Sequence, residues 1–406
     1  MSNPDLKNPD LYIDKVPHDL FARLRREEPV YWNEEADGPG FWAILRHEDI
    51  VEVSRRPEIF SSAHANGGHR IFNENEVGVA GAGESAVGIP FISTDPPLHT
   101  QYRKLIMPAL SPARLGDIEV RIRERAAKLI DKVPLGEEID LVPLLSAPLP
   151  LLTLAELLGL APESWQQLYN WTNVFVGEDD PEFRSSPEKI GEVMGEFVGF
   201  CHELFAERKA HPGHDIASLL VNSEVDGKPA ALRDFIGNLI LVLVGGNETT
   251  RNSFSHTVVS FARNPQVWEQ VRAEPSILQK GTGEMVRHAS PVLHMRRTAT
   301  QDTEIGGRKI HKGDKVVMWY VSGNRDETVY DEPDMFDLTR KGPQHLGFGA
   351  GQHVCVGSRL AEMQLRVTFD LLAKRVKHFE LRSEPRRFRS NFLNGLKNLN
   401  VILHPL

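Results

Sequence analysis

The segment 348–357 (FGAGQHVCVG) constrains this chain more than any other, because it places a cysteine in a glycine-rich loop directly before a predicted helix. Gly349 and Gly351 allow the backbone to turn sharply and to approach a flat ligand closely. Cys355 lies just ahead of a helix that we expect to begin near Gly357. The N-terminus of a helix carries partial positive charge and free amides, which stabilise a thiolate. The loop therefore favours a cysteine thiolate as a metal ligand.

Other interpretations of this loop differ in how well they fit. A buried structural cysteine beside a turn stays open from the loop alone. A dinucleotide-binding turn does not fit, since the glycines do not form Gly-x-Gly-x-x-Gly. A closed zinc site does not fit either, because His353 and Cys355 lack the further ligands that it needs. The second cysteine, Cys201, has none of this glycine pattern. With Cys355 used as a ligand no internal disulfide can form, which favours a reducing cytoplasm.

A second informative segment is 241–250, inside a long helix predicted for residues 232–263. Gly245 and Thr249 are four residues apart and share a helix face, so that the missing side chain at 245 leaves space beside the threonine hydroxyl. Two adjacent glycines each cost about 1 kcal/mol relative to alanine inside a helix. Glu248 is an acid in a mostly apolar stretch, where burial is costly. The alternative is a glycine kink followed by a solvated polar end.

Taken in order along the chain, these segments resemble the motifs of the cytochrome P450 superfamily, in its soluble bacterial haem-thiolate branch. The loop 348–357 matches the haem-binding loop of that family in full. The resemblance implies a mainly α fold with small β-sheets, forming one large triangular domain over residues 1–406. It also implies haem b (iron protoporphyrin IX), with Cys355 as the ligand of the iron.

The resemblance assigns roles to further residues. Thr249 would hold the oxygen ligand and a water, and Glu248 would relay protons; many bacterial members have aspartate at the acid position, so the relay geometry here differs. Glu284, Arg287 and Arg340 would form a buried structural cluster, although an i,i+3 pair by itself is usually surface decoration. The expected haem contacts, including cations for the propionates, are His99, Arg103, Gly245, Arg297, Phe348, Gly349, His353 and Gly357.

The substrate pocket is expected to combine separated segments. They are the loop 63–88, the long helix, the turn near 292 and a C-terminal turn. The candidate substrate contacts are Leu241, Val242, Gly245, Val292, Leu293, His294, Phe392 and Leu393. Most are apolar, which favours a terpenoid, alkyl or steroid-like molecule over a sugar or nucleotide. Segments 246–252, 295–300 and 312–320 are also similar to branches that hydroxylate alkanes, terpene alcohols and steroid side chains.

Local patterns predict the main elements. Residues 29–32 and 41–45 indicate a hairpin, and 62–88 a long loop. Helices are expected at 118–133, 192–210, 232–263 and 360–376, strands within 306–320, and short strands and turns over 382–406.

Composition limits where the protein acts and what it binds. The 406 residues include 40% hydrophobic and 25% charged side chains, ordinary values for a soluble globular protein. No run of 18 apolar residues is present, and residues 1–15 lack the pattern of a signal peptide, so we expect a cytoplasmic protein without membrane spans. The net charge of -9 argues against nucleic acid as a partner.

The sequence therefore predicts a monooxygenase that inserts one oxygen atom from O2 into a hydrophobic small molecule. Two cysteines are too few for an iron–sulfur cluster with four thiolate ligands. Electrons would then come from a separate ferredoxin with an NAD(P)H-dependent reductase, docking near Lys104 and Arg359. Two alternatives are a peroxide-dependent haem-thiolate peroxygenase and a non-catalytic haem sensor or carrier. The pairing of Glu248 with Thr249 argues against both, since neither protonates bound O2.

Overall fold

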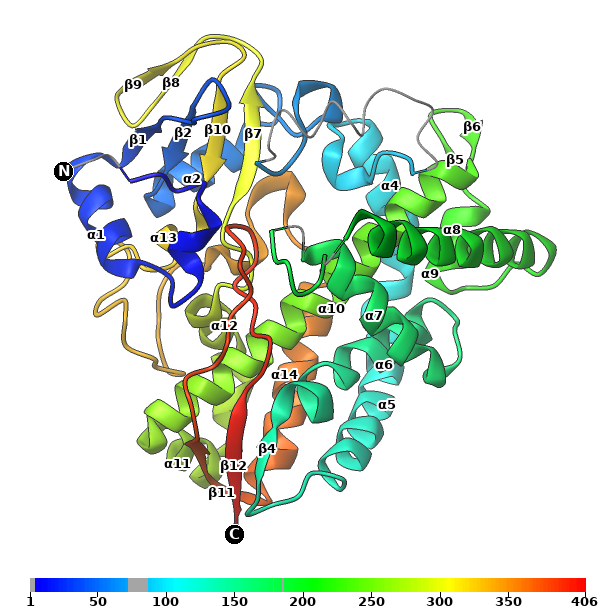
Figure 1. The fold of residues 1–406 in the computed structure, drawn as a ribbon, viewed down its shortest axis with the longest axis vertical. Helices are drawn as coiled ribbons and strands as arrows, with labels where there is room; N and C mark the ends of the chain where they lie inside the picture. Colours follow the sequence, from blue (N-terminus) through cyan, green and yellow to red (C-terminus); the bar gives the residue numbers. More distant parts are fainter. Residues whose placement is uncertain (1–3, 72–86, 178, 185) are drawn as a thin grey trace.

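A computed structural model describes residues 4–71, 87–177, 179–184 and 186–406. Helices dominate it (Figure 1). Their bounds are α1 His18–Glu27, α2 His47–Arg55, α4 Leu98–Ile106, α5 Pro112–Ile130, α6 Pro148–Leu157, α7 Trp165–Val176, α8 Pro187–Ala210, α9 Ile216–Val221, α10 Leu232–Arg263, α11 Pro265–Ala273, α12 Leu278–Ala289, α13 Tyr320–Gly323 and α14 Ser358–Ala373. Among the described residues, no helix combines the length and apolar character that a membrane span requires.

The strands form small sheets at the edges of the helical body (Figure 1). Their bounds are β1 Val30–Asn33, β2 Phe41–Ile44, β3 Phe60–Ser61, β4 Glu138–Asp140, β5 Glu224–Val225, β6 Lys228–Pro229, β7 Met295–Ala299, β8 Thr303–Ile305, β9 Arg308–Ile310, β10 Lys315–Met318, β11 Val376–Leu381 and β12 Asn400–Pro405. The largest sheet has the order β1-β2-β10-β7-β3, and a second has the order β11-β12-β4. A mainly α fold with small sheets is thus confirmed.

The predicted hairpin near the N-terminus is confirmed as β1 and β2. The two strands pair antiparallel, with Trp32 opposite Trp42. Their rings meet edge to face with centroids 5.0 Å apart, an arrangement that stabilises a cross-strand pair. Strand β10 then runs parallel to β2 and antiparallel to β7. Strand β10 therefore connects β7, which contains Arg297, to the N-terminal hairpin of β1 and β2.

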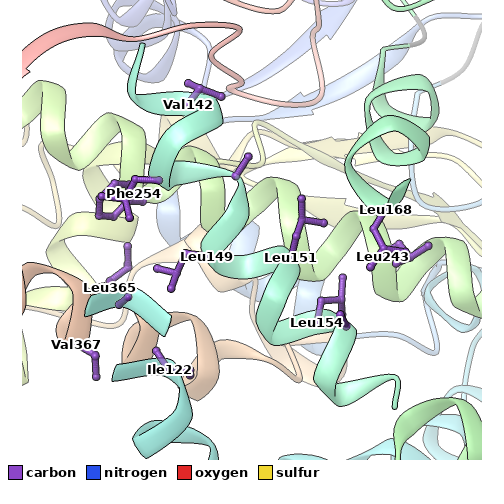
Figure 2. Close-up of a cluster of buried hydrophobic side chains, with 14 of the residues drawn as sticks. Ile122, Val142, Leu149, Leu151, Leu154, Leu168, Leu243, Phe254, Leu365 and Val367 are labelled. Atoms are coloured by element: carbon purple, nitrogen blue, oxygen red, sulfur yellow. The ribbon is translucent and has the colours of Figure 1, made fainter. Parts of the chain in front are cut away.

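Helix α10 is the central element of the helical body and has the predicted bounds, Leu232–Arg263. It contacts α6, α7, α8, α12 and α14. It ends at Arg263 because Asn264 precedes Pro265, and the residue before a proline disfavours helical backbone. Figure 2 shows the apolar core around it, with Leu243 and Phe254 of α10 beside Leu151 of α6 and Leu365 of α14. These helices fix α10 rigidly across the molecule.

Some predicted boundaries were wrong. The helix expected to reach residue 376 ends at Ala373, because Val376 begins β11 and pairs with Pro405. The helix expected to reach residue 133 ends at Ile130. Tyr320, expected in a strand, begins α13 instead. The last sheet hydrogen bond before it is donated by the N–H of Trp319 to the carbonyl of Ile44. Most of the predicted loop 62–88 lies outside the described residues, which resume at Val87.

Candidate functional site

A cavity of about 420 Å³ lies between α10 and the cysteine loop. Side chains from α4, α6, α7, α10, α14, β7 and the C-terminal turn line it, and most of them are apolar. Cys355 lines it from one element and Thr249 from another. The cavity therefore brings together the two segments that the sequence marks as most informative.

The cysteine loop has the tight geometry that its glycines predict. Gly349 and Gly351 have φ angles of +70° and +65°, in the left-handed region that favours glycine. A side chain at Gly351 would place its Cβ 2.1 Å from the carbonyl oxygen of Ser54, so only glycine fits there. The backbone N–H of Cys355 donates to the Phe348 carbonyl at 2.8 Å. Gly357 is the N-cap of α14, which confirms the predicted start of that helix.

Burial raises the pKa of the Cys355 thiol, while a backbone hydrogen bond from Gly357 and the charge of Arg103 act in the opposite direction. The hydrogen bond and the positive charge near the sulfur are of the kind that stabilise a thiolate. By themselves they do not outweigh the effect of burial on the pKa. A bound metal ion removes this obstacle, because coordination favours the deprotonated sulfur.

Four basic side chains meet at one end of the cavity: His99 and Arg297, which are buried, and Arg103 and His353, which are half-buried. The rings of His99 and His353 are stacked with centroids 3.9 Å apart. Burial, followed by the charges of Arg103 and Arg297, lowers the pKa of His99 to about 4. Burial and the same neighbours also hold the pKa of His353 far below its ordinary value. The group is a basic pocket inside the protein.

Two nitrogens of this basic pocket, Nδ1 of His99 and Nε2 of His353, are buried without a hydrogen-bond partner in the described chain. The Arg103 guanidinium donates to the Val354 carbonyl at 2.6 Å and that of Arg297 to the Arg296 carbonyl at 2.7 Å. Buried donors and cations without an anion are costly. The carboxylates of a haem, next to a cysteine ligand, match this donor set, so the site fits haem b.

Thr249 faces the cavity from α10. Its hydroxyl donates to the carbonyl of Gly245 at 2.7 Å. A Cβ added at Gly245 would meet nothing within 4 Å, so the open space expected beside the threonine is present. The hydroxyl and the gap together leave room for a small ligand and a water next to Thr249.

Glu248, the adjacent acid, does not line the cavity. Its carboxylate is fully buried, with Oε2 2.9 Å from Nη2 of Arg251. Oε1 accepts a hydrogen bond from Asn247, whose amide also donates to Thr172 of α7. Burial raises the pKa of Glu248, and Arg251 opposes that shift. The carboxylate therefore packs toward α7, away from the hydroxyl of Thr249.

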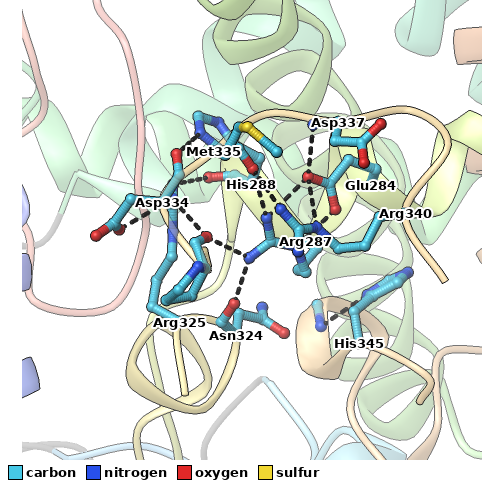
Figure 3. Close-up of polar contacts among 12 residues, drawn as sticks. Glu284, Arg287, His288, Asn324, Arg325, Asp334, Met335, Asp337, Arg340 and His345 are labelled. Atoms are coloured by element: carbon cyan, nitrogen blue, oxygen red, sulfur yellow. Dashed lines mark hydrogen bonds and ion pairs between the residues drawn. The ribbon is translucent and has the colours of Figure 1, made fainter. Parts of the chain in front are cut away.

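The expected cluster around Glu284 is present and buried (Figure 3). Arg287 donates to both carboxylate oxygens of Glu284, at 2.6 and 2.8 Å. Arg340 donates to the same carboxylate at 3.3 Å and to the carbonyl of Met335 at 2.8 Å. The cluster joins the chain between β10 and the cysteine loop 348–357 to helix α12, because Arg287 also donates to the carbonyls of Asn324 and Pro333.

The cavity contains most, but not all, of the predicted site residues. All eight expected haem contacts and six expected substrate contacts line it, the latter being Leu241, Val242, Gly245, Val292, Phe392 and Leu393. Leu293 and His294 do not. Leu293 is fully buried in a separate core with Val317 and Trp319. His294 is fully buried as well, and its Nδ1 bonds to the Asn391 carbonyl at 3.0 Å.

The sequence analysis did not name the lining residues His69, Arg70 and Tyr320, although the first two lie in the loop 63–88 that it placed at the pocket. His69 Nδ1 lies 2.6 Å from the Ser93 hydroxyl, and Arg70 lies over the Phe392 ring, 4.1 Å from its centroid. Arg70 therefore places one cation beside the predicted substrate contact Phe392. No motif marks residues 69 and 70, because only the tertiary fold brings them to the C-terminal turn.

Comparisons with known proteins agree on one family. A family model described as Cytochrome P450 matches residues 153–404. A Linalool 8-monooxygenase from Pseudomonas putida is 73% identical over 405 residues, with 100% of both chains covered. A Steroid C26-monooxygenase from Rhodococcus jostii (strain RHA1) is 34% identical, over 98% of this chain and 84% of its own.

Solved structures agree with these relatives. Cytochrome P450-153 from Novosphingobium aromaticivorans superposes with a TM-score of 0.87 at 33% identity, covering 98% of this chain and 99% of that one. A Mycobacterium marinum cytochrome P450 in complex with pseudoionone has a TM-score of 0.87 at 32% identity, covering 95% and 94%.

Proposed function

The chain belongs to the cytochrome P450 family, and on that premise we propose that its substrate is linalool or a closely similar terpene alcohol. The protein is a haem b monooxygenase that acts on hydrophobic molecules. Such a reaction takes a C–H bond, O2, two electrons and two protons to an alcohol and water. The observation that carries the substrate proposal is the 73% identity with a linalool 8-monooxygenase over the whole chain.

The cavity supports a substrate of this kind. Apolar side chains from several separated elements line it, including Leu241, Val244, Val292 and Phe392. A mostly apolar lining with few polar groups binds a hydrophobic molecule by shape. An arginine and a threonine hydroxyl are the kind of polar groups that bind the single hydroxyl of a terpene alcohol. A sugar would leave several of its hydroxyls without partners.

We propose the following roles for the site residues. Cys355 is the ligand of the haem iron, and the haem, when bound, activates O2 and transfers one oxygen atom. Arg103 and Arg297 would neutralise the haem carboxylates, and the neutral imidazoles of His99 and His353 would donate hydrogen bonds to them. Thr249 holds a water in the space beside Gly245, at the place where protons must arrive. Glu248 delivers protons only after its carboxylate leaves Arg251, because the two are now paired 2.9 Å apart.

The electron donor is proposed to be a ferredoxin with its reductase. Lys104 is an exposed cation on α4, the helix that carries Arg103. Arg359 is an exposed cation on α14, the helix that follows Cys355. Positive side chains next to the haem ligand favour the approach of a small acidic protein.

Titration of the purified haem protein with linalool tests the substrate proposal. We expect the ferric iron to shift from low to high spin, and a reconstituted system under labelled O2 to give a hydroxylated product with one labelled oxygen. A steroid and a sugar of similar concentration serve as comparisons. A spin shift with the sugar but not with linalool would overturn the proposal.

A further inference from the structure

The loop after α7 and the C-terminal turn are joined by a buried ion pair outside the cavity. Asp180 lies in the loop, and its side chain is only 2% exposed. Lys397 lies on the second limb of the turn 386–397, and its ammonium is 2.9 and 2.8 Å from the two carboxylate oxygens of Asp180. Neither residue lines the cavity. The pair is therefore not a substrate contact.

The carboxylate of Asp180 also binds the backbone of both segments. It accepts hydrogen bonds from the N–H of Arg389, on the first limb of the turn, at 2.9 Å, and from the N–H of Glu182, in its own loop, at 3.1 Å. Hydrogen bonds and charge hold the pKa of Asp180 below its ordinary value in spite of burial. One side chain thus fastens two limbs of the turn to the loop.

The two segments that Asp180 joins each supply a wall of the cavity. The loop follows α7, whose last residues Phe175 and Val176 line the cavity, and the turn carries Phe392 and Leu393 at its tip. Val176 packs with Phe392 and Leu393 in one small apolar cluster. In Figure 1 the C-terminal turn and the chain after α7 lie beside each other, in agreement with these contacts.

We propose that Asp180 and Lys397 are positioning residues for the substrate. Their ion pair holds the end of α7 against the turn 386–397 and so fixes the distance between Val176 on one wall and Phe392 on the other. This inference rests on the proposed use of the cavity for substrate. It adds two residues to the determinants of binding, both outside the lining of the cavity.

The chain offers a matched control. Arg386 and Glu182 form an exposed ion pair between the same two segments, at 2.8 Å, with side chains that are 61% and 48% exposed. Glu182 Oε2 also lies 2.7 Å from the Lys397 ammonium, so Glu182 keeps a cation when Arg386 is replaced. An exposed pair contributes little, whereas a buried charge that loses its partner is costly. Arg386→Met should therefore leave substrate binding unchanged. Lys397→Met removes the largely buried cation from both Asp180 and Glu182, and it leaves the buried Asp180 carboxylate with backbone donors alone.

The experiment uses the holoprotein and measures the spin shift on binding of linalool, the red shift of the Soret band on binding of the nitrogen ligand 4-phenylimidazole, and the dissociation rate of each. For Lys397→Met we expect about tenfold weaker binding of both, which lies within the roughly 100-fold effect that a misplacement of about 1 Å can have. At saturation with linalool, the shift of the iron to high spin should also be less complete than in the wild type, because a loosened wall of the cavity admits water. The double variant Asp180→Asn/Lys397→Met should recover part of the loss, because no buried charge is left unpaired.

Two outcomes separate this inference from the proposed function. If the wild type binds 4-phenylimidazole but not linalool, the substrate proposal is wrong, and the azole still tests the role of the pair. If Lys397→Met and the double variant both bind the two ligands with wild-type affinity and dissociation rate, the inference is overturned, whatever their thermal stability. If Lys397→Met does not fold, the double variant decides by the same comparison with the wild type.

Discussion

Glu248 Oε2 lies 2.9 Å from Arg251 Nη2, one turn further along the same helix, and both side chains are buried against α7. The acid proposed to deliver protons is thus held in an ion pair next to the cavity. The Arg251 guanidinium also donates to Asn173 at 3.2 Å and lies over the Tyr169 and Phe388 rings. Proton delivery by Glu248 would require this contact to open.

This geometry gives a prediction that separates the structural and the proton-transfer roles of Glu248. Glu248→Gln should slow turnover about 100-fold, the usual size of a general-acid effect. It should also lower the free energy of unfolding by about 3 kcal/mol, since Arg251 keeps a buried charge without its partner. Turnover and denaturant unfolding of the same preparation measure the two effects.

The double variant Glu248→Gln/Arg251→Met is the control for that prediction. It should regain stability, because neither charge remains, but it should not regain turnover. Arg233→Met breaks an exposed pair on the same helix and should change neither quantity. Recovery of turnover in the double variant would show that Glu248 acts only as a partner of Arg251.

Thr249→Ala removes the hydroxyl that faces the cavity beside Gly245. We expect the variant to keep haem and substrate binding. The electrons from NAD(P)H should instead reduce O2 to hydrogen peroxide, so that less product forms. Thr249→Ser keeps the hydroxyl and should stay close to the wild type. The ratio of product formed to NAD(P)H consumed is the measurement, and an unchanged ratio in Thr249→Ala would remove Thr249 from the proposed mechanism.

Buried histidines predict how stability depends on pH. Burial lowers the pKa of His294 from 6.5 to about 3, so the folded protein holds it neutral while the unfolded chain binds a proton below pH 6.5. Its contribution to stability is therefore present above pH 6.5 and lost as the pH falls toward 3. Between pH 7 and 4.5 this one group should remove about 2 to 3 kcal/mol.

His294→Gln should flatten that pH dependence, because glutamine does not titrate and can still donate to the Asn391 carbonyl. His311, whose side chain is 69% exposed, provides the control, and His311→Gln should leave the slope unchanged. Unfolding by denaturant at several pH values measures the slopes. Equal slopes for His294→Gln and the wild type would contradict the assignment of a neutral buried imidazole.

Electron supply gives a prediction about salt. If an acidic ferredoxin docks near Cys355, its reduction of the haem should slow as ionic strength rises, since salt screens the attraction. Lys104→Ala and Arg359→Ala should slow reduction at low salt. Lys377→Ala should not, because Lys377 lies in β11, beyond the end of α14 that is distant from Cys355. Stopped-flow reduction measures the rates, and a rate independent of salt would argue against electrostatic docking.

Local chemistry explains what could be predicted from the sequence. The spacing of Gly349, Gly351 and Cys355 describes one continuous turn, so its geometry follows from the residues themselves. The bounds of α10 follow in the same way from its apolar spacing and from Pro265. The sequence also brings Thr249 to the cavity correctly, because its helix face is set by its distance from Gly245.

Tertiary packing explains what could not be predicted. The direction of the Glu248 carboxylate depends on Arg251 and on α7, a separate helix. Leu293 and His294 adjoin Val292 in sequence, yet the pairing of Val292 with Leu393 leaves only part of that turn facing the cavity. The Asp180–Lys397 pair joins residues 217 positions apart. No local pattern marks contacts of this kind.

The reduced, CO-bound absorption spectrum of the wild type, Cys355→Ala and Cys201→Ala tests the central claim most directly. Cys201 is fully buried in the helical core, and burial raises the pKa of its thiol to about 12. We expect the wild type and Cys201→Ala to show the red-shifted band of a thiolate ligand, and Cys355→Ala to lose it. A thiolate band that survives in Cys355→Ala and disappears in Cys201→Ala would contradict the account.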